Sequence, residues 1–164
     1  MRIVTWFHDL ATPVGRLRLL ADPTGLSAIE FWSRRSLATA NVGWRRDAAP
    51  FRPLCGQLAE YFAGKRRKFD VELAPLGTSF QQSVWQELQR IPYGASISYA
   101  ELARRIGRPS AYRAANAANG ANPWPIVVPC HRVIGSDQSL TGFGGGLDAK
   151  RTLLRLESDA LSGR

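Results

Sequence analysis

The sequence predicts an α/β protein in two parts, a small N-terminal β-sheet domain with a helix and a mainly helical C-terminal domain. Short β-rich runs separated by turn residues dominate the first part, whereas apolar residues recur at helical spacing in the second. Residues 74–77, which contain Pro and Gly, lie between the two patterns and are typical of a linker. We therefore expect an N-terminal α/β domain over residues 1–74 and a C-terminal domain over residues 75–164.

The N-terminal part predicts strands connected by tight turns. Segments with Pro and Gly at residues 12–15 and 22–25 indicate two turns, and the runs around them are rich in β-favouring residues. Apolar residues at helical spacing predict a helix over residues 52–63. The strands are expected over residues 2–7, 16–21, 26–32 and 69–73.

Two capping-box patterns predict where helices begin in the C-terminal part. Ser79 is followed three residues later by Gln82, and Ser98 is followed in the same way by Glu101. An apolar stripe follows each box, as expected for a helix that packs on a core. The Pro- and Gly-containing segments that end these helices lie at residues 92–94 and 107–109.

A third helix is expected over residues 111–119, with Ser110 as its cap. Most of its residues are alanine, and Arg113 is its only charged residue. Together with the helix before it, and the tight turn between them, it resembles a helix-turn-helix. Its small side chains suit close approach to a DNA groove or close packing against a core, and both interpretations stay open.

The chain is strongly basic. Its 22 Lys and Arg residues outnumber its 13 Asp and Glu residues, which gives a net charge of +9. A small globular protein with such a charge is often attracted to nucleic acid. The alternative is a basic surface that binds nothing, and charge alone does not choose between the two.

The cysteines indicate a reducing compartment. Cys55 and Cys130 form no secreted-type disulfide framework, and residues 1–6 lack the apolar segment of a signal peptide. The Cys residues and the two His residues, His8 and His131, are not paired at zinc-ligand spacing, so we expect no metal and no cofactor. No apolar run approaches membrane-spanning length. We therefore expect a cytoplasmic protein, monomeric at this size.

Cys130 lies in the most specific segment of the chain. Several prolines stiffen residues 122–135, which therefore predict a rigid irregular loop. A buried thiol is normally inert because burial disfavours the thiolate. His131 changes this expectation, because a base beside a thiol can remove its proton directly or through water. A carboxylate could orient the imidazole, and the spacing leaves four candidates open. They are Asp137, Asp148, Glu157 and Asp159.

The segment Pro129-Cys130-His131-Arg132-Val133 resembles the active-site signature of the O6-alkylguanine-DNA alkyltransferases. The resemblance is strong from about residue 78 to residue 157, and it is weaker but compatible before that. Further matching pieces are Pro92-Tyr93-Gly94, Ser98-Tyr99, Arg113-Ala114, Asn122-Pro123 with Pro125, and Gly145-Gly146-Leu147 with Lys150 and Glu157. The resemblance implies a ribonuclease-H-like N-terminal domain and a winged-helix-like C-terminal domain that contains the helix-turn-helix.

The resemblance also implies roles for the residues around the thiol. Cys130 would accept the alkyl group irreversibly, with His131 as base and Glu157 as the carboxylate that orients it. Asn122 would hold the hinge between the recognition helix and the active-site loop. The remaining residues would bind guanine: Tyr99 as donor to the ring, the carbonyls of Cys130 and Val133 as acceptors from the amine, the Gly144 amide toward O6, and Pro125 and Phe143 against the flipped base.

Double-stranded DNA carrying O6-alkylguanine is the partner that this resemblance implies. The reactive atom is inaccessible inside a stacked duplex, so the base must be flipped out. Arg113 would fill the gap from a helix in the minor groove, flanked by Ala111, Tyr112, Ala114 and Asn116. Phosphate contacts would make binding largely independent of sequence. The candidates for these contacts are Arg104, Arg105, Arg108 and Arg132, while the basic run at residues 65–68 is interpreted as a solvated turn.

Three other functions would account for part of this pattern. A non-catalytic sensor of alkylated DNA lacks the acceptor cysteine, whereas Cys130 is present here. A Cys-His hydrolase would explain Cys130 and His131 but neither Arg113 nor the net charge of +9. A plain winged-helix regulator would need no Cys-His pair. One local departure from the family pattern is Gly144, where some members have Ser, and only a backbone amide is needed there.

Overall fold

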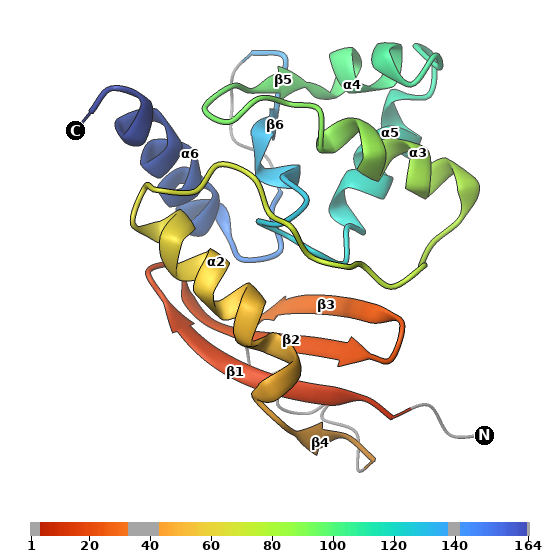
Figure 1. Cartoon of the computed structure of the whole chain (residues 1–164). Helices are drawn as coiled ribbons and strands as arrows, with labels where there is room; N and C mark the ends of the chain where they lie inside the picture. The colour runs from red at the N-terminus through yellow and green to blue at the C-terminus, as the bar shows by residue number, and fades with distance from the viewer. Residues whose placement is uncertain (1–3, 33–42, 138–141, 164) are drawn as a thin grey trace. The chain divides into compact units, whose positions relative to one another are not determined.

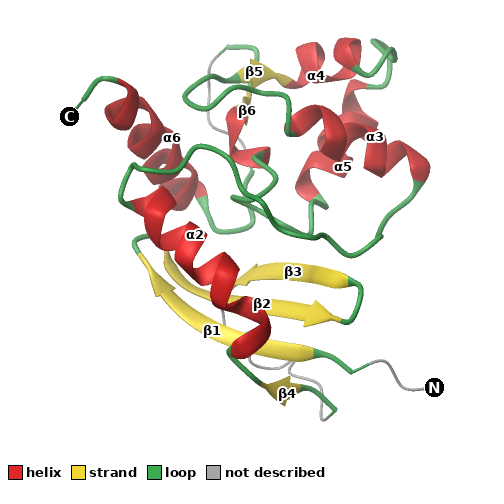
Figure 2. Cartoon of the chain, viewed as in Figure 1, coloured by secondary structure: helices red, strands yellow, loops and turns green. Residues whose placement is uncertain are grey.

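The computed structural model describes residues 4–32, 43–137 and 142–163. The chain divides into two compact units, Met1–Pro75 and Leu76–Arg164. Strands and a helix form the first unit, and helices dominate the second (Figure 1, Figure 2). The expected α/β class is therefore confirmed. No helix in the described ranges is both long and apolar enough to cross a membrane.

The first unit is an antiparallel sheet with a helix on one face. Strands β1 (Trp6–Thr12), β2 (Gly15–Asp22) and β3 (Gly25–Phe31) form successive hairpins, and β4 (Arg45–Arg46) pairs in parallel with β1. Helix α2 (Arg52–Phe62) follows the short 3-10 helix η1 (Ala49–Phe51) and crosses the sheet (Figure 1). The core comes from strand residues, above all those of β2, and from one helix face. It includes Leu17, Leu19, Ile29, Leu54 and Leu58.

Two of the expected strands differ from the structure. The first begins at Trp6 and continues into the hairpin turn, and Arg2 and Ile3 of the expected strand lie outside the described residues. Residues 69–73 contribute only an isolated bridge between Leu26 and Leu73. The side chain of Gln57 bonds both the N–H and the C=O of Asp70, at 2.8 and 2.9 Å. A side chain thus satisfies the backbone groups that a ladder would have paired, which the alternating pattern could not reveal.

The second unit packs its helices around a small two-stranded sheet. Helices α3 (Ser79–Leu88), α4 (Tyr99–Arg105) and α5 (Tyr112–Gly120) pack on one another (Figure 2). Strands β5 (Ile97–Ser98) and β6 (Val133–Ile134) pair in parallel, and the 3-10 helix η2 (Cys130–Arg132) immediately precedes β6. Helix α6 (Leu147–Leu161) packs against η2.

The helix caps agree only in part with the expected ones. Ser98 caps α4 by accepting from the N–H of Glu101 at 3.0 Å, as expected. For α3 the expected box was wrong by one residue, because Thr78 and Gln81 form it reciprocally. Ser110 was also wrong as a cap, since Ala111 occupies that position in α5 without a side-chain hydrogen bond.

Candidate active site

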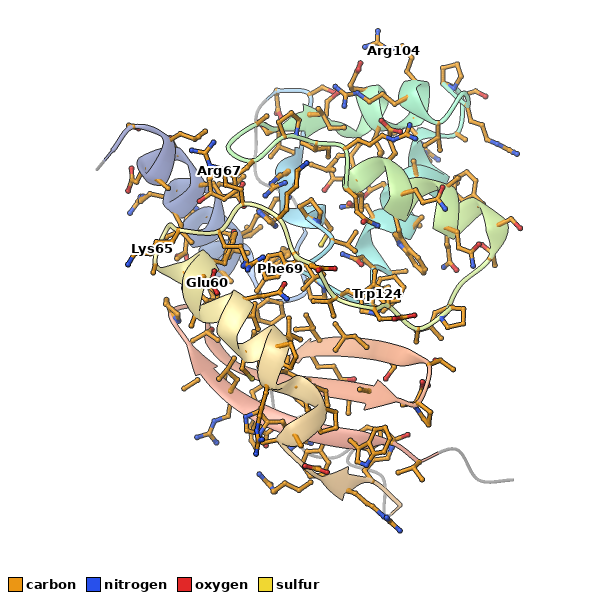
Figure 3. All side chains as sticks on the ribbon, in the orientation of Figure 1. Glu60, Lys65, Arg67, Phe69, Arg104 and Trp124 are labelled. Carbon is orange, nitrogen blue, oxygen red and sulfur yellow. The ribbon has the colours of Figure 1, made fainter. Side chains whose placement is uncertain are left out.

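The loop between α5 and η2 is held by its own polar side chains. Asn122 donates from Nδ2 to the carbonyl of Val128 at 2.8 Å, and its Oδ1 accepts from the N–H of Trp124 at 3.0 Å. The indole of Trp124, labelled in Figure 3, meets Trp85 of α3 edge to face at 5.4 Å. Ile126 has φ of 75°, a strained value for a β-branched residue, which other contacts must hold in place. The loop therefore delivers Cys130 to a defined position.

Cys130 is buried and carries a free thiol. Burial raises the pKa of this thiol, while a hydrogen bond from Asn122 and the charge of Lys150 oppose the rise. Cys55, by contrast, is half-buried on α2, and burial alone raises its pKa. Of the two thiols, Cys130 alone has partners that favour its thiolate.

His131 and Glu157 form a buried pair. The His131 Nε2 lies 2.6 Å from Glu157 Oε2, and both side chains are completely buried. With Nε2 held by the carboxylate, Nδ1 is the nitrogen left to exchange a proton, and no described residue bonds it. Burial lowers the pKa of His131, although Glu157 opposes this effect. The imidazole is therefore suited to act as a neutral base.

Glu157 is the carboxylate that the structure brings to His131. Of the other candidates, Asp148 is fully exposed at the start of α6, where it pairs with Arg151 at 2.9 Å. Glu157 also accepts from the N–H of Gly94 at 3.1 Å. Burial disfavours its ionised form, but hydrogen bonds from His131 and Arg132 outweigh burial and lower its pKa to about 2. Glu157 is thus a permanent anion at the centre of the unit.

Arg132 is part of this buried network. It was expected as a candidate for a phosphate contact, and the structure corrects this. Its guanidinium binds Glu157 through Nε at 2.8 Å and Nη2 at 3.1 Å, while Nη1 donates to the carbonyl of Ile91 at 2.9 Å. Its side chain is only 7% exposed, and three of its N–H groups bond inside the unit, so it is not placed to reach a phosphate. No pattern in the sequence around Arg132 predicts that its side chain is buried.

Lys150 of α6 and Asn119 of α5 contact the backbone of residues 130–133. No role was assigned to either residue from the sequence. The Lys150 Nζ donates to the carbonyl of Val133 at 2.7 Å, and the whole residue is buried. Asn119 of α5 donates to the carbonyl of Cys130 at 3.5 Å. Lys150 and Glu157 are seven residues apart on α6, so helical periodicity alone could have placed both on one face.

The residues expected to bind guanine belong to different elements of the second unit. Tyr99 begins α4 and is nearly buried, Val133 is buried in β6, and Pro125 is buried in the hinge loop. Phe143 is half-buried, and its carbonyl accepts from Gly146 at 2.9 Å before α6 begins. Gly144 is exposed, and a Cβ built there meets nothing within 4 Å. A serine side chain would therefore fit at this position without a steric clash.

The small residues of helix α5 lie both against the core and on the exposed surface. Ala115, Ala118 and Asn119 are buried against the unit. The opposite side is exposed, and Ala111 lies half-buried at the N-cap. The exposed residues are Tyr112, Arg113, Ala114, Asn116, Ala117 and Gly120. The helix therefore packs closely on the core and still presents a thin surface with a single arginine.

The other basic residues differ in availability. Arg104 of α4 points into solvent (Figure 3) and is 70% exposed, although it is paired with Glu101. Arg105 bonds Glu101 at 2.9 Å, and Arg108 lies 5.7 Å from the ring centre of Phe80. In the basic run of the first unit, Arg66 bonds Glu60 at 3.2 Å and the carbonyl of Lys68 at 3.0 Å, next to the labelled Lys65 of Figure 3. These bonds fit a turn that follows a helix.

Most of the chain matches two family models in order. Residues 7–75 match the ribonuclease-like domain of 6-O-methylguanine DNA methyltransferase, and residues 79–159 match its DNA-binding domain. The chain belongs to this family. The two matches place the chain in this family, and the site described above fits that placement.

Relatives in archaea and bacteria share this organisation. The methylated-DNA–protein-cysteine methyltransferase of Methanosarcina barkeri is 44% identical, over 95% of this chain and 99% of its own length. The protein of the same name from Mycolicibacterium paratuberculosis is 46% identical, over 92% and 91%. Among solved structures, Mycobacterium tuberculosis OGT in complex with DNA superposes with a TM-score of 0.87, at 44% identity and over 94% of each chain.

Proposed function

We propose that this protein repairs DNA by moving an alkyl group from O6 of guanine onto its own Cys130, once per molecule. It is a methylated-DNA–protein-cysteine methyltransferase that binds double-stranded DNA containing O6-alkylguanine. One observation supports Cys130 as the acceptor. His131, the residue directly after it, forms a buried pair with Glu157 at 2.6 Å. A non-catalytic sensor would have no use for this arrangement.

The reaction is a displacement at the alkyl carbon. The Cys130 thiol gives its proton to His131 Nδ1, directly or through water, and Glu157 stabilises the imidazolium that forms. The sulfur then forms a bond to the alkyl carbon, and the bond from that carbon to O6 breaks. The electron pair passes to guanine, which takes a proton from the Tyr99 hydroxyl. The proton held by His131 then returns through water to the Tyr99 phenolate, so both groups end neutral. A thioether has no easy leaving route, so the protein is consumed.

The remaining guanine contacts are assigned to residues of the second unit. Val133 offers a backbone carbonyl to the exocyclic amine, as Cys130 does, and the Gly144 amide is directed at O6. Pro125 and Phe143 lie on the two faces of the flipped base. A site without bulk water suits this chemistry, because water would compete for the alkyl group. Neither a metal nor a cofactor takes part in these steps.

The exposed face of α5 is the proposed DNA-binding surface. Arg113 fills the gap left by the flipped base, and Ala114 and Asn116 lie along the minor groove with Ala111 and Tyr112 at its entrance. Small residues allow the helix axis to come close to the narrow groove. We further propose domains over residues 1–74 and 75–164, a cytoplasmic location, and a monomer in solution.

Cys130 is expected to become methylated, and Cys55 is not. The reason is that only Cys130 has a base and a buried carboxylate behind it. Duplex DNA with a single O6-methylguanine is incubated with the protein, and peptide mass spectrometry locates the added methyl group. One methyl per protein on Cys130 supports the proposal. A methyl group on Cys55 alone, or release of a free product over many turnovers, contradicts it.

Arg113→Ala is expected to slow repair of duplex DNA about tenfold or more, because unstacking a base costs a few kcal/mol and the mutant cannot fill the gap. Reaction with the free O6-methylguanine base should change little, since that substrate needs no extrusion. Single-turnover rates on both substrates check this, with Arg90→Ala, whose side chain is 76% exposed, as the matched control. Equal slowing on both substrates would mean that Arg113 supports the pocket or the fold instead.

A further inference from the structure

Helix α6 places two buried charges of opposite sign on one face. Lys150 and Glu157 are seven residues apart, with Leu153 between them, and all of these residues are completely buried. Glu157 contacts the His131 end of the segment 130–133, at 2.6 Å from Nε2. Lys150 contacts the other end, at 2.7 Å from the carbonyl of Val133. The segment containing the nucleophile is therefore held between a cation and an anion from the same helix.

A buried lysine needs an explanation. Taking an ammonium group out of water is expensive, and burial accordingly lowers the pKa of Lys150, an effect that its attraction to Cys130 opposes. The hydrogen bond to Val133 satisfies one donor of the group, and a methionine of similar volume would fill the space without any charge to bury. Packing alone therefore does not account for a lysine here.

The charges of Lys150 and Glu157 can both assist the proton transfer from Cys130 to His131. The transfer creates a negative sulfur and a positive imidazole from two neutral groups. Glu157 stabilises the positive product, and a cation near the sulfur stabilises the negative one. Lys150 attracts the Cys130 thiolate and repels a charged His131. Its field favours the anion on sulfur, and Glu157, 2.6 Å from the imidazole, favours the proton on His131.

We propose that Lys150 is a positioning residue for alkyl transfer, which stabilises the Cys130 thiolate and fixes the Val133 carbonyl that receives the guanine amine. The inference deepens the proposed function and rests on it. One lone pair of that carbonyl is taken by Lys150, which leaves the other for the substrate. Lys150 touches neither the alkyl carbon nor the thiol proton, and it acts through Cys130 and Val133.

The test compares Lys150→Met, Lys150→Arg and the control Arg151→Met, the neighbouring residue with a half-exposed side chain. Single-turnover transfer from free O6-methylguanine base is measured first. The rate of Cys130 modification by iodoacetamide is then followed against pH, with peptide mass spectrometry separating Cys130 from Cys55. Thermal denaturation of each variant reports folding. The iodoacetamide profile reports the thiol without using alkylguanine at all.

Lys150→Met is expected to slow transfer at pH 7 about tenfold or more, as removal of one fixed charge at a reacting centre does. Its iodoacetamide profile should shift toward higher pH by about one unit, while its melting temperature stays within about 5 °C of the wild type. Lys150→Arg keeps the charge and should keep the wild-type profile, and Arg151→Met should match the wild type throughout.

An unshifted iodoacetamide profile in folded Lys150→Met would overturn the inference. Failure of Lys150→Met to fold would also overturn it, because the lysine would then serve the structure. A wild-type protein that transfers no alkyl group refutes the proposed function, and the thiol profiles still report separately on Lys150.

Discussion

Cys130→Ala is expected to lose alkyl transfer completely and to bind duplex DNA as tightly as the wild type. The proposed acceptor is removed, and the remaining thiol, Cys55, has no base beside it, so no residual reaction is expected. DNA binding depends on phosphate contacts and on the exposed face of α5, neither of which involves the sulfur. Burial of a small side chain is lost, which should lower the free energy of unfolding by only about 1 kcal/mol.

Two measurements check this result on the same preparation. Transfer of a labelled methyl group from O6-methylguanine duplex DNA is followed to completion, and fluorescence anisotropy gives the affinity for the same duplex. Cys55→Ala is the matched control and should retain full transfer. If folded Cys130→Ala lost DNA affinity along with transfer, the sulfur would have to be part of the binding surface, and the assignment of the site would be wrong.

Glu157→Ala is expected to cost about 3–5 kcal/mol in unfolding free energy, as removal of one partner from a buried ion pair does. The mutation would leave the buried guanidinium of Arg132 without its carboxylate, and it would also leave Gly94 N–H unpaired. Transfer should fall as well, because His131 would lose the group that orients it. Urea denaturation gives the stability change, with fully exposed Asp148→Ala on the same helix as control.

The effect of Glu157→Ala should depend on pH in a defined direction. The pKa of Glu157 is lowered from 4.5 to about 2 in the folded protein. The stability that its charge contributes, roughly 3 kcal/mol from that shift, is fully present above pH 4.5 and is lost as the pH falls toward 2. The difference between wild type and variant should therefore shrink over this range. A difference that stays constant from pH 7 to pH 3 would contradict an ionised Glu157.

His131 adds to the acid sensitivity of the wild type. Because its folded pKa lies below the ordinary value of 6.5, the unfolded chain binds the proton more readily. Stability should therefore begin to fall as the pH drops below about 6.5, before the loss from Glu157 starts. Both groups act in the same direction, so the protein is expected to unfold easily in acid.

Local patterns in the chain were sufficient for much of the architecture. The spacing of apolar residues indicated α2 and α3, Ser98 indicated the start of α4, and the turn residues indicated the first hairpin. Each of these features depends on residues within one or two turns of chain, so a sequence pattern contains it. The strand expected at residues 69–73 failed because Gln57, thirteen residues earlier, bonds the backbone of Asp70.

The sequence by itself indicated the reactive pair, because Cys130 and His131 are adjacent in a proline-rich loop, and the resemblance to a known family indicated alkyl transfer as its reaction. Only the tertiary structure decided how that pair is supported. Glu157 is 26 residues from His131, and Arg132 reaches back 41 residues to Ile91. Lys150 contacts Val133 across seventeen residues. Such contacts depend on how α6 packs against η2, and several carboxylates at similar distances along the chain offered the same local signal.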